Sequence, residues 1–129
     1  MIKALLIDDD PIQLRLTELL VKRTQAFGQL QIFRTADLAL GFLESGDHAD
    51  ELPDVILLDL NMPVTDGWMF LTRFADILPQ LGKTIHIFIL SSSIDENEIA
   101  RSRQYPFVSG FISKPISPDI LQGILTRVS

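Results

Sequence analysis

The chain has 129 residues, 47% of them hydrophobic, no cysteine, and a net charge of −6 at pH 7. This length fits one domain with a real core, and the lack of cysteine excludes disulfides and thiolate metal sites and agrees with a reducing cytoplasm. The acidic balance argues against direct nucleic-acid binding, and the first apolar run is too short for a signal peptide or membrane span. We therefore expect one cytoplasmic domain over residues 1–129.

A strand followed by a helix is expected at the start of the chain. The apolar run over 2–7 predicts the strand, which ends in Asp8-Asp9-Asp10. Asp10 suits a helix N-cap with Gln13 as its capping-box partner, and Pro11 suits the first turn. Gly28 is the expected end of this helix. The apolar residues that recur at helical spacing are Ile12, Leu16, Leu19 and Leu20.

A second strand and helix follow, and then an acidic loop. Leu30, Ile32 and Phe33 predict a short strand over 29–34. Thr35 is expected to cap a helix over 36–44. The loop over 47–54 leads to the next strand.

Residues 55–58 are four consecutive apolar residues, and this run ends in Asp59. A run without polar residues is typical of a strand that is covered on both faces, as in a parallel sheet. Turn-forming residues occupy 62–67. Ligands of open parallel sheets bind beyond the carboxyl ends of the strands, so Asp59 is a candidate site residue.

Two further strand–helix units complete the chain. An amphipathic helix is expected up to Leu81, with Pro79 breaking or kinking its last turn. The strand over 85–90 leads into Ser91-Ser92-Ser93, and Ser93 with Glu96 forms a capping-box pattern for a helix over 95–104.

The last strand is expected over 107–112, interrupted at Ser109-Gly110. Ser113-Lys114-Pro115 follows it, and Ser117-Pro118 opens the final helix. Five strand–helix units predict a five-stranded, parallel, doubly wound α/β fold of flavodoxin-like type, with strand order 2-1-3-4-5.

The strands of such a sheet end at one edge, which gathers Asp8, Asp9, Asp59, Ser91 and Lys114. Three neighbouring carboxylates repel each other unless a cation lies among them, and an oxygen-rich site of this kind suits Mg²⁺. Carboxylates, a divalent cation, an ammonium group and a hydroxyl together indicate phosphoryl transfer, with Asp59 as the nucleophile and an acyl phosphate as the product.

The chain resembles the receiver domain of two-component response regulators over essentially its whole length. Four motifs carry the resemblance, and each lies at the end of an expected strand. They are Leu-Leu-Ile-Asp-Asp-Asp-Pro at 5–11, Leu-Leu-Asp-Leu-Asn-Met-Pro-Val-Thr-Asp-Gly at 57–67, Ile-Leu-Ser-Ser at 89–92 and Phe-Ile-Ser-Lys-Pro at 111–115.

The resemblance implies a role for each matching residue. Asp59 is the phosphoacceptor, supplied by a phosphohistidine on a sensor histidine kinase or histidine phosphotransfer protein. Asp8, Asp9, Asp59 and the backbone carbonyl of Asn61 hold Mg²⁺.

Other matching positions concern the phosphoryl group and the switch. Ser91, with its neighbour Ser92, is the switch hydroxyl site, and Lys114 pairs with the phosphoryl group. Phe111 is the switch aromatic, although it lacks the hydroxyl of the Tyr that is frequent there. The Lys114–Pro115 bond is often cis in this family.

The resemblance also implies a signalling protein rather than an enzyme, although one that assists its own phosphorylation and dephosphorylation. We expect a stand-alone receiver without an output domain. Its output is expected through residues 95–128, which contact a downstream protein target, pass phosphate onward in a relay, or form a phosphorylation-dependent homodimer from a monomer. Neither His48 nor His86 has a metal-spaced partner, and Trp68 is expected near the site.

Two alternatives come from other classes. Phosphatases of the haloacid-dehalogenase type also use an Asp nucleophile, but they place a second Asp where this chain has Asn61. A degenerate receiver that serves only as a scaffold is the other. Flavin- and nucleotide-binding relatives need a glycine-containing phosphate loop after the first strand, and this chain has acids and Pro11 there.

Overall fold

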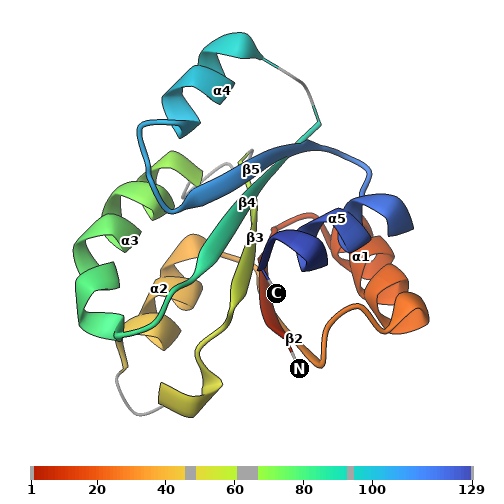
Figure 1. The fold of residues 1–129 in the computed structure, drawn as a ribbon, viewed down its shortest axis with the longest axis horizontal. Coiled ribbons are helices and arrows are strands. Elements are labelled where there is room, and N and C mark those ends of the chain that lie inside the picture. Colours follow the sequence, from red (N-terminus) through yellow and green to blue (C-terminus); the bar gives the residue numbers. More distant parts are fainter. Residues whose placement is uncertain (1, 46–48, 61–66, 93–94, 129) are drawn as a thin grey trace.

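The structure is a computed structural model that describes residues 2–45, 49–60, 67–92 and 95–128. Five parallel strands form one sheet in the order β2-β1-β3-β4-β5, which confirms the predicted topology (Figure 1). The strands are β1 (Lys3–Ile7), β2 (Gln29–Phe33), β3 (Val55–Asp59), β4 (His86–Ser91) and β5 (Val108–Ser113).

Helices cover both faces of the sheet. In Figure 1, α2 and α3 lie on one side of the strands and α1 and α5 on the other, while α4 lies beyond β5 at the top of the view. The elements are α1 (Pro11–Thr24), α2 (Ala36–Glu44), a short 3₁₀ helix (Ala49–Glu51), α3 (Gly67–Leu81), α4 (Glu96–Ser102) and α5 (Pro118–Val128).

The core is split into two layers by the alternation of side chains along the strands. In β3, Ile56 and Leu58 join the cluster beneath α2 and α3, while Val55 and Leu57 join the cluster beneath α1 and α5. All five residues of β3 are buried, as expected for a strand covered on both faces. β5 is one of the two edge strands, and all of its residues are only half-buried.

The start of α1 follows the sequence prediction, but its end does not. The side chain of Asp10 accepts hydrogen bonds from the backbone N–H groups of Ile12 (2.9 Å) and Gln13 (3.4 Å), as an N-cap should. The helix ends at Thr24, because Gln25 takes a left-handed conformation with φ of 54°. The prediction that Gly28 ends this helix is therefore wrong.

Of the apolar stripe that predicted α1, Leu20 packs against the core layer beneath α1 and α5, but the other three residues face away from it. Ile12, Leu16 and Leu19 are 69%, 52% and 45% exposed. The buried residues of α1 are Leu14, Thr17 and Val21.

Three other boundaries differ from or refine the predictions. α3 continues through Pro79 to Leu81, so the predicted break at Pro79 is wrong. Proline lacks a backbone N–H and so removes one helical hydrogen bond, but only two helical residues follow it. α4 is shorter than the predicted 95–104, and its N-cap is Asp95, which accepts from the N–H of Asn97 at 2.8 Å. The predicted capping box from Ser93 is therefore wrong, because Asp95 lies directly before the helix, while Ser93 itself is outside the described residues.

The predicted interruption of the last strand is confirmed as a shift in strand register. Ile87 of β4 pairs with Val108 and Phe88 pairs with Gly110, so Ser109 has no partner in the ladder. The predicted helix cap at Thr35 is also confirmed, because its hydroxyl accepts from the N–H of Leu38 at 3.2 Å.

Gly67 tests how closely α3 is packed against the end of β3, and Gly41 in α2 serves as the comparison. A Cβ on Gly67 would lie 3.0 Å from the Cα of Leu60, whereas a Cβ on Gly41 in α2 would meet nothing within 4 Å. We predict that Gly67→Ala lowers the free energy of unfolding by about 1–3 kcal/mol because backbone must move. Gly41→Ala should raise it by about 0.5–1 kcal/mol, because alanine favours the helix. Urea unfolding measures both, and a neutral Gly67→Ala would contradict the packing.

Candidate functional site

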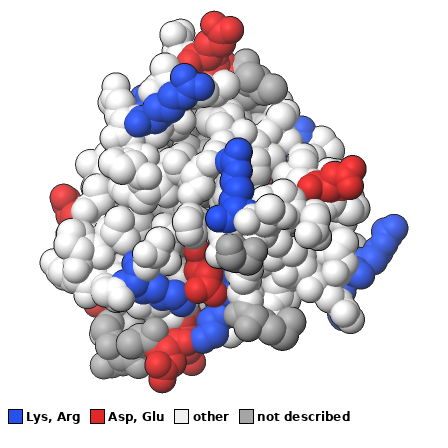
Figure 2. Space-filling view, in the orientation of Figure 1, with Lys and Arg blue, Asp and Glu red and all other residues white. Residues whose placement is uncertain are grey.

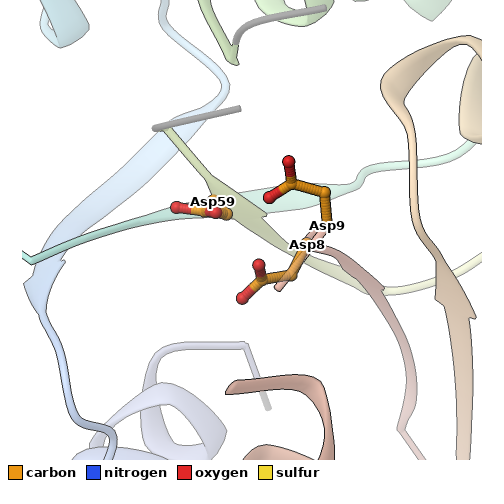
Figure 3. Close-up of side chains that lie close together, drawn as sticks. All are labelled: Asp8, Asp9 and Asp59. Atoms are coloured by element: carbon orange, nitrogen blue, oxygen red, sulfur yellow. The ribbon is translucent and has the colours of Figure 1, made fainter. Parts of the chain in front are cut away.

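Three carboxylates meet at the carboxyl edge of the sheet. Asp8 and Asp9 follow β1, Asp59 ends the neighbouring β3, and Figure 3 shows the three side chains leaving these two strand ends. One oxygen from each carboxylate lies within 4.8 Å of the others. The structure therefore brings together the acids that the strand order predicted to meet.

Two of these acids are buried. Asp8 is 1% exposed and Asp59 is 2% exposed, while Asp9 is half-buried. The Oδ1 atom of Asp8 accepts a hydrogen bond of 3.0 Å from the N–H of Asp10. This bond replaces the expected capping-box bond from Gln13 to the same N–H, and it links the acidic cluster to the first turn of α1.

Lys114 supplies a positive charge inside the cluster. Its Nζ lies 3.1 Å from Oδ1 of Asp59 and 3.4 Å from Oδ2 of Asp8, and its side chain is 12% exposed. The backbone N–H of Lys114 donates to the carbonyl of Ser91 at 2.8 Å, which continues the β4–β5 ladder into the site. The Lys114–Pro115 peptide bond is cis.

One lysine does not balance three acids. The pKa of Asp59 is raised from 3.8 to about 6, chiefly by burial and next by the Asp8 carboxylate, while Lys114 lowers it in part. When all are ionised, Asp8, Asp9, Asp59 and Lys114 leave two net negative charges, which one divalent cation neutralises. All the donors are hard carboxylate oxygens, and the site has two negative charges in excess. Both features fit Mg²⁺.

A pocket of about 460 Å³ opens over this cluster. Asp9, Asp59, Ser92 and Lys114 line it, as expected for residues at strand ends. Asp10, Gln13 and Pro115 also line it, and the sequence analysis gave the first two only capping roles. Asp10 directly follows Asp9, and Gln13 lies in the first turn of α1, so their closeness to Asp9 in the sequence was the available signal.

The remaining predicted residues lie around the pocket or outside the described part of the chain. Ser91 is fully buried at the end of β4, opposite Ser113 of β5. Phe111 is half-buried, packs against the core layer beneath α2 and α3, and lines a different groove. Asn61 falls outside the described residues, as does the rest of 61–66.

Comparison with known proteins identifies the family of this site. The model of the response regulator receiver domain matches residues 4–126. The chain belongs to the response regulator receiver family. Receivers are phosphoacceptor signalling domains of two-component systems, whose partners are histidine kinases or phosphotransfer proteins and whose acidic pockets bind Mg²⁺ or Mn²⁺.

Individual relatives resemble this receiver over most of its length. The transcriptional regulatory protein MctR of Rhizobium johnstonii is 30% identical over 128 residues, which is 99% of this chain and 55% of MctR. Response regulator Rcp1 of Synechocystis is 32% identical over 100 residues, 76% of this chain and 67% of Rcp1. The receiver thus spans about half the length of MctR and two thirds of Rcp1.

Solved structures confirm the fold. A two-component response regulator from Cytophaga hutchinsonii superposes with a TM-score of 0.89 at 27% identity, covering 98% of this chain and 95% of that one. The Mn²⁺-bound form of Rcp1 superposes with a TM-score of 0.75 at 27% identity, covering 98% and 91%.

The surface charge and the helices can be compared with the expectations about nucleic-acid binding and membrane spans. On the face shown in Figure 2, Lys and Arg side chains stand among Asp and Glu rather than in one basic patch. Within the described ranges, every helix is too short or too polar to cross a membrane.

The raised pKa of Asp59 has a consequence for stability in metal-free protein. Between about pH 4 and pH 6 the folded state holds a proton on Asp59 that the unfolded state releases, so ionisation of Asp59 costs stability as pH rises through this window. We predict that Asp59→Asn raises the free energy of unfolding at pH 7.5 by about 1–3 kcal/mol. At pH 4.5 the gain should fall to less than half.

Urea unfolding in EDTA at both pH values measures this effect. Asp76→Asn, which removes an exposed acid from α3, is the control and should change stability by less than about 0.5 kcal/mol. A lower stability of Asp59→Asn at pH 7.5 would show that Lys114 already satisfies the charge of Asp59.

Proposed function

We propose that this receiver accepts a phosphoryl group on Asp59 from a phosphohistidine of a sensor histidine kinase or a histidine phosphotransfer protein. The observation that carries the proposal is the apposition of Asp8, Asp9 and Asp59 around Lys114, beneath an open pocket. In the transfer, a carboxylate oxygen of Asp59 bonds to phosphorus, the bond from phosphorus to the histidine nitrogen breaks, and the product is an acyl phosphate.

Mg²⁺ is the proposed cofactor. Asp8, Asp9, Asp59 and the backbone carbonyl of Asn61 hold it in this proposal. When bound, the ion neutralises the acidic cluster and the charge of the incoming phosphoryl oxygens. The two unbalanced negative charges at the site support this assignment, and so does the Mn²⁺-bound form of the relative Rcp1.

The other site residues act on the phosphoryl group once it is attached. The Nζ of Lys114 lies 3.1 Å from Oδ1 of Asp59. In this proposal it pairs with a phosphoryl oxygen once the phosphoryl group is attached. Ser91 and Ser92 donate hydrogen bonds to that group. Phe111, two strand positions before Ser113, moves inward as the hydroxyl of Ser91 does, although without a ring hydroxyl it offers only a packing signal.

The output surface is the face formed by α4, β5 and α5. A groove of about 510 Å³ crosses it, and its lining includes apolar Ile99, Phe111 and Ile120 and basic Arg103 and Arg127. In this proposal the receiver acts in the cytoplasm through protein contacts on this groove, without touching DNA itself. Binding of a target, onward relay, or pairing with a second receiver each use the same face.

A phosphate-affinity gel tests the function directly. We predict that the native receiver, incubated with acetyl phosphate, gives a retarded band only when Mg²⁺ is present. Asp59→Asn should give none, while Asp76→Asn, an acid-to-amide change on exposed α3, should behave as the native chain does.

The same gel separates the proposal from its rival. Absence of a retarded band from the native receiver with acetyl phosphate and Mg²⁺, and also with a phosphorylated histidine phosphotransfer protein, would make it a scaffold that signals without phosphate. A band that persists in Asp59→Asn would place the phosphoryl group on another residue.

A further inference from the structure

The helix α4 meets the rest of the receiver beside β5, through its buried Ser102, and through an aromatic cluster at its C-terminal end. It has seven residues, and a helix of that length is not stable by itself in water. Within the described part of the chain, no α4 side chain belongs to either hydrophobic core layer, and Ile99 faces the groove instead. Its position therefore depends on contacts outside the core.

Those contacts converge on Trp68. The guanidinium carbon of Arg101, in α4, lies 4.2 Å from the centre of the Trp68 ring, in cation–π contact. Tyr105, just after α4, stacks on the same ring at 6.3 Å between ring centres, and its hydroxyl lies 3.3 Å from Oγ1 of Thr72. Arg101 before the end of α4 and Tyr105 after it thus both contact the first turns of α3.

Trp68 is in turn fixed to the strand that carries Asp59. It follows Gly67, whose N–H donates to the carbonyl of Leu60 at 3.3 Å. The position of a Cβ on Gly67 would be 3.0 Å from the Cα of Leu60 and 3.3 Å from the carbonyl oxygen of Asp59. The same Cβ would also be 3.0 Å from Cδ1 of Leu60, so Gly67 lies directly against Leu60. A shift of the backbone at Asp59 and Leu60 therefore moves the start of α3, where Trp68 lies.

We propose that Trp68, Arg101 and Tyr105 form a latch that couples the state of Asp59 to the position of α4. The inference rests on the proposed phosphorylation of Asp59 and adds how it reaches the output groove. α4 supplies one side of that groove through Ile99, Ser102 and Arg103. A change at the end of β3 alters the Arg101–Trp68 contact, α4 shifts, and the groove changes shape.

The coupling is reciprocal. A partner that docks in the groove and displaces α4 loosens the same latch and so changes how readily Asp59 is phosphorylated. Couplings between two sites in proteins commonly change affinity by about 5- to 150-fold.

The latch can be read without a label, because Trp68 is the sole tryptophan of the sequence. The experiment follows Trp68 emission of the full chain with Mg²⁺, before and after acetyl phosphate, beside the phosphate-affinity gel. Three proteins are compared: native, Arg101→Gln, and Arg23→Gln as the matched control. Arg23 is exposed in the last turn of α1, as Arg101 is in the last turn of α4, so its change removes the same charge from a helix end without removing the cation over Trp68.

We expect phosphorylation to shift Trp68 emission in the native chain and in Arg23→Gln. In Arg101→Gln the gel should still show phosphorylation, while the emission shift falls at least twofold. Hydrogen exchange of the α4 amides in the unphosphorylated proteins should rise by about two- to fivefold in Arg101→Gln, the factor that an exposed cation–π contact is worth. Arg23→Gln should leave the exchange of the α4 amides unchanged.

Each outcome decides a different point. If the native receiver is phosphorylated but Arg101→Gln matches Arg23→Gln in both emission and exchange, the latch is wrong and the proposed function stands. If the native receiver is not phosphorylated, the proposed function fails and the latch fails with it.

Discussion

The repulsion among three acids at one sheet edge is the constraint on which the site depends. Parallel strands β1 and β3 end side by side, so their terminal carboxylates approach within 4.8 Å, two of them out of water. Lys114 offsets only part of this charge, and the pKa of Asp59 stays raised to about 6 by burial first and by Asp8 second. A site in this condition favours a ligand that brings positive charge, and one Mg²⁺ ion would meet that need.

The same constraint shapes the structure around the site. Asp8 is shared between Lys114 and the N–H of Asp10, so the acidic cluster also fixes the entry into α1. Gly67 is required where α3 presses on the Asp59 strand end. Farther out, the structure loosens: β5 is half-buried and α4 lies outside both core layers. A tightly built site beside a lightly held helix is an arrangement in which a small local change can shift a population.

The sequence predicted the sheet and the site because both rest on strong local signals. The apolar run before Asp59 specifies a central strand, and parallel topology then gathers Asp8, Asp9, Asp59 and Lys114 without further information. The errors arose where several residues compete for one role. Asp95 caps α4 in place of Ser93 because it is nearer the helix, and Gln25 ends α1 before Gly28. The exposed stripe of Ile12, Leu16 and Leu19 and the contact of Arg101 with Trp68 depend on tertiary packing, which periodicity alone does not show.

Calorimetric titration of the native receiver with Mg²⁺ at pH 7.5 and pH 5.0 tests the central claim most directly. That claim is that one divalent cation balances a buried cluster in which Asp59 holds a proton below about pH 6. The account predicts one Mg²⁺ per chain and an affinity about tenfold weaker at pH 5.0, because a proton on Asp59 must leave before the ion binds. Absence of binding at pH 7.5, or an affinity that is the same at both pH values, would contradict it.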